Sequence, residues 1–210
     1  IQESLGEFRQ AADLWSHESG SRVQVGTLTD RDFDGDLDFL ALSDLGPPST
    51  FWRNDGVLNG EVQWVDDGSE VGAALEIAAM GLDSADLNRD GRLDYCMSDV
   101  GPPRCLLSDG MGGYVEGANA LGFRVNTPIT PDIDTVGWSV ELADIDNSGW
   151  PEFIQASGPD PGTWAEQVHE IPNVLWWADD DGGWSDESLA AGFTDTANHI
   201  GMVSADFDGD

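Results

Sequence analysis

Short apolar stretches separated by turn residues run along the whole of this chain. Gly, Pro, Asp and Asn stand between successive stretches, which is typical of β-strands joined by tight turns. The 3.6-residue period of a helix is weak outside residues 70–79 and 188–191, which allow about one helical turn each. We therefore expect an all-β fold. The predicted strands of the first unit cover residues 22–29, 39–43, 51–56 and 62–65.

The same succession of strands and turns recurs at a regular interval. An acidic loop follows the first strand of each unit, and these loops start at residues 30, 86, 144 and 206, which are 56, 58 and 62 residues apart. Such an interval indicates an array of supersecondary units. A Gly-Pro turn separates the second strand from the third in each of the first three units. The later strands are predicted at residues 80–85, 95–98, 105–110 and 114–115, then at 138–143, 153–156, 175–180 and 184, and finally at 200–205.

Four antiparallel strands in each repeated unit predict a β-propeller. A β-helix would need much shorter coils, and a sandwich would not repeat its turn chemistry at a constant interval. Residues 6–15 resemble residues 113–122, so we expect residues 1–20 to supply the outer strand of a preceding blade. An open stack would leave unpaired edges, which a closed ring or neighbouring chains in an assembly would cover. The blades are predicted at residues 21–74, 75–130 and 131–195, and a further blade starts within residues 196–210.

The acidic loops carry the spacing D-x-D-x-D-G-x-x-D, which places carboxylates close together after each first strand. Oxygens at positions 1, 3 and 5, a backbone carbonyl at position 7 and a turn-forming Gly at position 6 are typical of calcium loops. An EF-hand would carry Glu at position 12, where this chain has Ala41, Met97 and Gln155, so the acid at position 9 takes that place. The other reading is an Asp-rich hairpin turn without a metal ion.

The spacing predicts a separate set of ligands in each loop for Ca²⁺, which prefers hard oxygen donors. By charge, we expect the first loop to bind best and the third loop, in which Ser148 replaces a carboxylate, to bind least well. The predicted ligands are Asp30, Asp32, Asp34 and Asp38 with the carbonyl of Asp36; Asp86, Asn88, Asp90 and Asp94 with the carbonyl of Arg92; and Asp144, Asp146, Ser148 and Glu152 with the carbonyl of Trp150. A fourth set begins with Asp206, Asp208 and Asp210.

The composition limits the partners of this chain. Its 210 residues carry 41 acidic and 8 basic side chains, a formal charge of −33, yet 40% of the residues are hydrophobic and nine are Trp. A packed core is therefore available in spite of the charge. We expect no binding to nucleic acid or to anionic membranes, because the basic charge that neutralises phosphates is missing, and no apolar run is long enough for a membrane span. No signal peptide is visible and the first residue is Ile, which favours a processed or excised chain.

Cys96 and Cys105 flank a Gly-Pro-Pro turn between two predicted strands. They are expected either to form a disulfide across the hairpin or to be two buried free thiols. Calcium loops favour the disulfide, because both features belong to an oxidising, calcium-rich exterior.

The third unit carries extra length at residues 157–172, and insertions in repeats often form the binding face. Trp164 and His169 in this insertion are the candidate ligand-face residues, whereas Trp138 and Trp150 lie beside turns. The scattered histidines, including His17 and His199, fit surface or capping roles. The tryptophans at repeat positions are expected between blades: Trp15, Trp52, Trp64, Trp176 and Trp184.

The repeated loops and turns resemble the FG-GAP/VCBS repeats of integrin α-subunit propellers and of many secreted bacterial proteins. Residues 173–184 look like the N-x-L-F-x-N-x-G-x-G-x-F segment of the subgroup that includes cartilage-acidic-protein and ASPIC/UnbV-associated repeats, although no ASPIC/UnbV domain is visible. The resemblance covers nearly the whole chain. It implies a calcium-stabilised, usually seven-bladed extracellular propeller, of which this chain would form about half.

The family includes adhesion modules, lectins, enzyme appendages and surface proteins, so the resemblance does not imply one function. We expect a secreted binding, adhesion or structural module whose calcium is structural, and which meets a protein or glycan on the face with the Gly-Pro loops. One alternative is a subunit of an extracellular filament or surface assembly. Another is a lectin or the scaffold of a carbohydrate-active enzyme. No nucleophile elbow, H-E-x-x-H motif or P-loop appears, so an enzyme is the less favoured reading.

Overall fold

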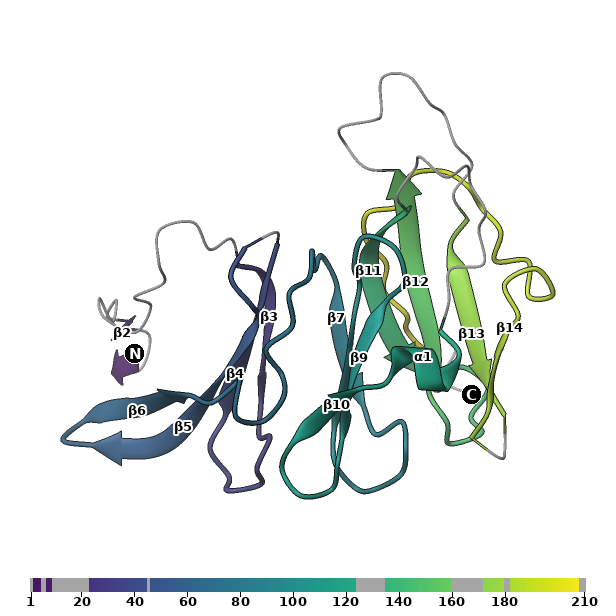
Figure 1. Ribbon diagram of the computed structural model, residues 1–210. Coiled ribbons are helices and arrows are strands. Elements are labelled where there is room, and N and C mark those ends of the chain that lie inside the picture. The colour runs from purple at the N-terminus through teal and green to yellow at the C-terminus, as the bar shows by residue number, and fades with distance from the viewer. Residues whose placement is uncertain are drawn as a thin grey trace. The chain divides into compact units, whose positions relative to one another are not determined.

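The computed structural model describes residues 2–4, 7–8, 23–44, 46–123, 135–159, 172–179 and 182–207. These residues form β-strands and one short helix, α1 (Ala118–Leu121), which confirms the predicted all-β class. Three antiparallel sheets of four strands each contain most of the strands (Figure 1). The chain divides into two compact units, Ile1–Ile77 and Ala78–Asp210.

The first unit holds one of the four-stranded sheets, in the order β3-β4-β5-β6. Its strands are β3 (Val23–Thr29), β4 (Asp38–Ser43), β5 (Thr50–Leu58) and β6 (Glu61–Asp66). Two further short strands, β1 (Gln2–Ser4) and β2 (Glu7–Phe8), pair with each other, while residues 9–20 of the expected outer strand lie outside the described residues.

The second unit holds two sheets of the same design, in the orders β7-β8-β9-β10 and β11-β12-β13-β14. The first contains β7 (Leu82–Ala85), β8 (Asp94–Met97), β9 (Arg104–Ser108) and β10 (Tyr114–Glu116). The second contains β11 (Thr135–Ala143), β12 (Glu152–Pro159), β13 (Val174–Ala178) and β14 (Trp184–Asp186). Each acidic loop connects the first and second strands of its sheet, as the repeat predicts.

One predicted strand is wrong. Residues 200–205 form no strand, and the segment instead lies along β11, where the Ser204 N–H donates a hydrogen bond of 2.7 Å to the Glu141 carboxylate. A strand needs a partner backbone, and no strand of the described residues pairs with this segment. Its backbone groups therefore do not enter a strand ladder.

The fourth strand of each sheet leads into the same tight turn. In all three, a backbone N–H bonds to the carbonyl four residues earlier, which makes one helical turn, and α1 is the longest version. Each turn ends on a glycine in the left-handed region: Gly72, Gly122 and Gly192. The bonds are Val71 to Asp67 at 3.0 Å, Leu121 to Gly117 at 3.1 Å and Ala191 to Glu187 at 2.8 Å.

Phe123, the residue after the α1 turn, carries the contact between the two sheets of the second unit. Its ring lies 4.7 Å from Phe153, 5.2 Å from Trp176 and 4.9 Å from Trp184, between ring centroids. Phe123 is 0% exposed, and the core around it includes the disulfide between Cys96 and Cys105 that joins β8 to β9. Trp176 and Trp184 therefore lie between sheets, as their repeat positions predict. Trp52 and Trp64 are half-buried in the first unit, and Trp15 lies outside the described residues.

The first strands β7 and β11 also lie side by side in the second unit. A β-bridge joins Val100 to Val136, and a Cβ on Gly81 would come within 2.6 Å of the Ser139 Cα, so only glycine permits this approach. The Asp83 carboxylate of β7 accepts the Leu142 N–H at 2.8 Å. Glu141 of β11 makes the equivalent bond to Ser204, so β11 meets the segment at residues 200–205 through the same kind of contact.

Candidate metal centres

The three acidic loops share one conformation. In each, the N–H of the position-6 glycine donates to the first aspartate, at 3.2 Å in the first loop, 2.9 Å in the second and 2.8 Å in the third. These glycines have φ between 83° and 94°, which other residues adopt only with strain. The residue at position 4 is also left-handed, although it is not glycine. The position-4 residues are Phe33, Arg89 and Asn147.

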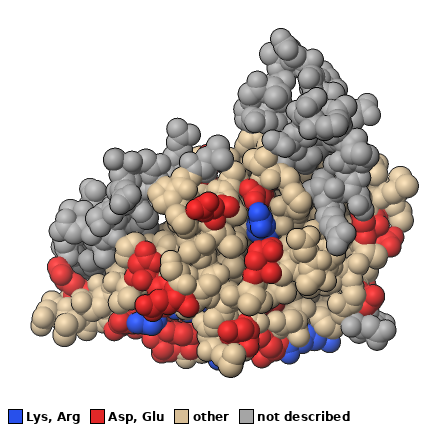
Figure 2. All heavy atoms as spheres, in the orientation of Figure 1, with Lys and Arg blue, Asp and Glu red and all other residues tan. Residues whose placement is uncertain are grey.

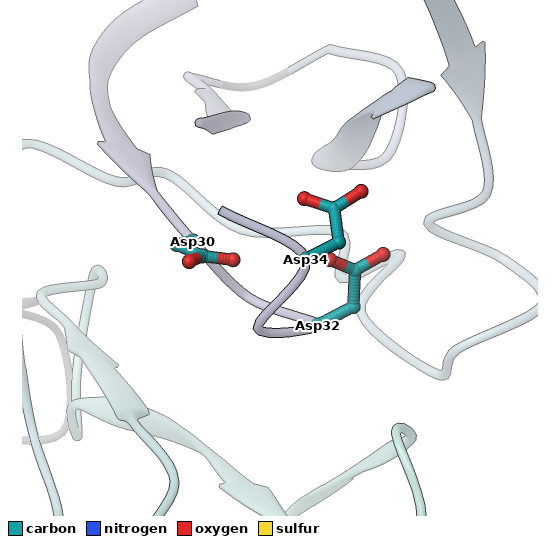
Figure 3. Close-up of side chains that lie close together, drawn as sticks. All are labelled: Asp30, Asp32 and Asp34. Atoms are coloured by element: carbon teal, nitrogen blue, oxygen red, sulfur yellow. The ribbon is translucent and has the colours of Figure 1, made fainter. Parts of the chain in front are cut away.

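The first loop gathers three carboxylates. Oxygens of Asp30, Asp32 and Asp34 all lie within 4.8 Å of one another (Figure 3). Asp32 and Asp34 are exposed, whereas Asp30 is half-buried and its Oδ1 is a buried atom that accepts no hydrogen bond from any described residue. Three like charges at this distance repel one another unless a cation lies among them.

The third loop gathers Asp144, Asp146 and Glu152, again with oxygens within 4.8 Å. Glu152 is 0% exposed. Its Oε2 accepts the Ile145 N–H at 2.7 Å, but its Oε1 is buried and has no hydrogen-bond partner among the described residues. A buried carboxylate oxygen without a donor costs about 1–3 kcal/mol or more, so this atom fits a site that a cation completes.

The second loop is held by an internal network. The Asp90 N–H donates to Asp86 at 3.1 Å and to Asn88 at 2.9 Å, while the Asn88 amide donates to the Ser108 carbonyl at 3.4 Å. Asn88 replaces a carboxylate, and no group of three acidic, His or Cys ligand atoms forms within the described part of this loop. The structure thus brings the predicted carboxylates together in the first and third loops and leaves the second with a mixed set.

The acids at position 9 have a second role that the spacing does not reveal. Asp38 and Asp94 are 0% exposed, and both accept two backbone hydrogen bonds. Asp94 takes the Leu87 N–H at 2.8 Å and the Ser108 N–H at 2.7 Å, which ties its loop to the third strand of the sheet. Asp38 does the same with Arg31 at 3.0 Å and Asn54 at 2.8 Å, and it is not part of the cluster of the first loop.

Burial raises the pKa of all three acids at position 9. It raises the pKa of Asp38 and Glu152 and raises the pKa of Asp94 to about 6, and the neighbouring acidic side chains add to the effect. Exposed Asp146 shows the opposite shift, because hydrogen bonds from Ser148 lower its pKa, with Trp177 among the smaller contributors. The deep acid of each loop therefore resists ionisation unless positive charge is near.

This burial predicts an acid-stabilised protein in metal-free buffer. The Asp94 carboxyl titrates near 3.8 when unfolded and near 6 when folded, so the folded state holds a proton that the unfolded chain has lost. Stability should fall by roughly 3 kcal/mol as the pH rises through this window and then stay level. Urea unfolding in high monovalent salt, which screens the surface acids, measures it. An Asp94→Asn variant should show a flatter profile, and an equal slope in both proteins would contradict the assignment.

The remaining predicted residues fall in different places. Asp36, Arg92 and Trp150 hold position 7, and Asp206 lies beside Asp144 across a surface hollow. Asp208, Asp210, Trp164 and His169 lie outside the described residues, as does His17. His199 caps the other end of its sheet, with its Nδ1 3.1 Å from the Asn173 amide and its Nε2 3.5 Å from Asp195.

Acidic side chains greatly outnumber basic ones in this chain, with 41 against 8. On the face shown in Figure 2, acidic side chains far outnumber basic ones. The two clusters offer hard oxygen donors without His or Cys, so they could hold a metal ion of the kind that prefers oxygen. Within the described part of the chain, no helix is long and apolar enough for a membrane crossing.

Comparison with known proteins does not assign this chain to a family. No model of a known protein family matches this sequence, and no curated protein sequence matches it either.

Proposed function

We propose that this chain is part of an extracellular β-propeller whose acidic loops bind Ca²⁺ and which serves as a binding, adhesion or structural module. The observation that carries the proposal is Glu152, a fully buried acid that contributes to a carboxylate cluster while one of its oxygens lacks a donor. The FG-GAP/VCBS resemblance stays a prediction that agrees with this reading.

Calcium suits the donor set better than its competitors. Ca²⁺ accepts six to eight oxygens in flexible geometry, whereas Mg²⁺ demands a compact octahedron and keeps several waters. The first cluster joins two exposed carboxylates to the half-buried Asp30, and the third joins two exposed carboxylates to the buried Glu152. In both loops, position 7 can add a backbone carbonyl. Since each cluster spans the connection between two neighbouring strands, a bound cation would fix that hairpin, which is a structural role.

Several features support the propeller. The three sheets share strand order, loop conformation and final turn. In the second unit, equivalent carboxylate–amide bonds join β7 to β11 and β11 to the segment at residues 200–205. Neighbouring blades that each pack one sheet face on the next would use such a repeated contact. The disulfide between Cys96 and Cys105 supports an oxidising, extracellular setting.

Calcium titration tests the proposal. After treatment with a chelator, adding Ca²⁺ should release or absorb heat in a calorimeter and raise the unfolding temperature. A concentration 100 times the Kd should stabilise the protein by about 2.7 kcal/mol, and Mg²⁺ at the same concentration should do less. No heat and no shift of the unfolding temperature would reject a calcium role.

Exposed apolar residues favour a second candidate, a subunit of an extracellular assembly. Leu189 is 83%, Val203 84% and Phe207 93% exposed, all in the last part of the second unit. Large apolar side chains that are exposed to solvent can mark a contact with another protein. Light scattering discriminates: a monodisperse monomer across the accessible concentration range would reject self-assembly of this chain.

A further inference from the structure

Arg89 of the second loop reaches into the third loop. Its guanidinium lies over the Trp150 ring, 3.6 Å from the ring centre, and its Nη2 donates to the Gly149 carbonyl at 2.8 Å. Arg89 and Gly149 are 60 residues apart along the chain, and their loops belong to different sheets. Arg89 stands at position 4, where its backbone is left-handed with φ of 57°, and its side chain extends to the third loop.

The residues that Arg89 contacts organise the third loop. The Gly149 N–H donates to Asp144 at 2.8 Å, and the Trp150 N–H donates to the Ser148 hydroxyl at 3.2 Å. The Trp150 ring also lies against Gly182, where a Cβ would approach it to 3.3 Å. The ring is thus held by the Arg89 guanidinium and by the turn between β13 and β14. This clamp acts on the half of the loop that runs from Gly149 toward Glu152.

We propose that Arg89 is a positioning residue for the cation site formed by Asp144, Asp146 and Glu152, and that it couples the second loop to the third. The inference rests on the proposed calcium function and names a residue outside the third loop that shapes its binding site. Arg89 holds Gly149 and Trp150 in the conformation in which Asp144 is already bonded to the Gly149 N–H. A loop that is organised before binding loses less conformational freedom when the cation enters.

The positive charge of Arg89 has the opposite effect on cation affinity. A guanidinium near a cation site repels the cation, so removing Arg89 could also tighten binding. Arg89 is exposed, and the repulsion between exposed charges is screened by water and salt. The hydrogen bond and the stacking contact are short-range and are not weakened in this way. We therefore expect positioning to exceed repulsion, with the difference growing at higher salt.

Coupling follows from the same contact. Whatever orders the second loop also orders Arg89, and so favours the third loop. Because binding couplings are reciprocal, cation binding at the third loop should favour the second loop by the same factor. Disrupting the second loop with Asp86→Asn should therefore weaken cation binding at the third loop, although Asp86 belongs to a different sheet.

Calcium calorimetry tests the proposal on a parent chain with Asp30→Asn and Asp34→Asn, so that heat comes from the second and third loops. Adding Arg89→Gln should weaken third-loop binding about fivefold. Arg104→Gln is the matched control: it removes the same charge from the same sheet, where Arg104 pairs with Asp99 at 3.3 Å at the end of β9 away from the loops. This control should stay within about twofold of the parent.

Further variants separate positioning from charge and from folding. Arg89→Lys keeps the charge but loses the planar stacking group, so it should resemble Arg89→Gln if positioning matters and the parent if charge matters. Unfolding in chelator should remain a single cooperative transition in both variants, which shows that they are folded. If Arg89→Gln does not fold, Arg89→Lys alone tests the proposal. In the Arg89→Gln background, Asp86→Asn should no longer affect the third loop.

The outcomes are distinct. If the parent chain binds no Ca²⁺ at all, the proposed function fails. If the parent binds Ca²⁺ and Arg89→Gln binds equally well or more tightly, the calcium function stands and the positioning role of Arg89 is rejected. An undiminished effect of Asp86→Asn in the Arg89→Gln chain would reject the coupling.

Discussion

Replacing Phe123 with Ala is expected to destabilise the second unit by about 4 kcal/mol. Phe123 is fully buried, and its ring contacts Phe153, Trp176 and Trp184 of the neighbouring sheet. Truncation removes the apolar burial, leaves a cavity and breaks three aromatic contacts, each of which adds to the area term. Urea unfolding at a fixed calcium concentration measures the loss.

Phe207 supplies the control for this truncation. It is 93% exposed, so Phe207→Ala makes the same chemical change without opening a cavity and should cost less than about 0.5 kcal/mol. If both variants lost similar free energy of unfolding, the contact of Phe123 between the two sheets would not stabilise the second unit as its burial indicates.

Glu152→Gln is expected to weaken the proposed Ca²⁺ binding at the third loop by at least about tenfold, because it removes a negatively charged oxygen donor from the cluster. In metal-free buffer near pH 7 the same change should leave the protein equally stable or more stable. Burial and the nearby Asp146 and Asp144 raise the pKa of Glu152. Without a cation, the ionised carboxylate therefore destabilises the folded state. The amide oxygen of Gln can still accept the Ile145 N–H.

These opposite signs distinguish a ligand from a structural acid. If Glu152 only held the loop, the substitution would destabilise the protein with and without Ca²⁺. Unfolding measured at saturating Ca²⁺ and in chelator gives the stability with and without the ion, and calorimetry gives the affinity for Ca²⁺. Glu70→Gln is a suitable control, since Glu70 is an exposed acid in the turn after β6 and its loss should change neither quantity appreciably.

Local rules account for most of the sheet architecture. Gly at position 6 and the alternating apolar stretches predict the acidic hairpins, and the structure forms them in all three sheets with the same bonds. These features depend on residues a few positions apart, so they can be read directly along the chain. Residues 200–205 show the limit of such rules, since their predicted strand pairs with no strand in the described part of the chain.

The role of each acidic side chain does not follow from the loop spacing. Asp94 matches the calcium spacing, yet in the fold it accepts the Ser108 N–H from the third strand, 14 positions further along the chain. Its burial, and with it the raised pKa, depends on the strands that pack around it. Spacing shows which carboxylates lie in a loop, but it does not show which of their oxygens are already engaged.

For this chain, residue order alone establishes the four-stranded units, their tight turns and the acidic loops, because neighbouring residues set backbone conformation and side-chain alternation. The packing of Phe123 against the next sheet, the unpartnered Glu152 oxygen and the stacking of Arg89 on Trp150 follow from the folded arrangement. Arg89 and Trp150 are 61 positions apart, from 89 to 150, and no local pattern links them. Their contact exists because two separate sheets pack together and bring the ends of their first hairpins within reach of one long side chain.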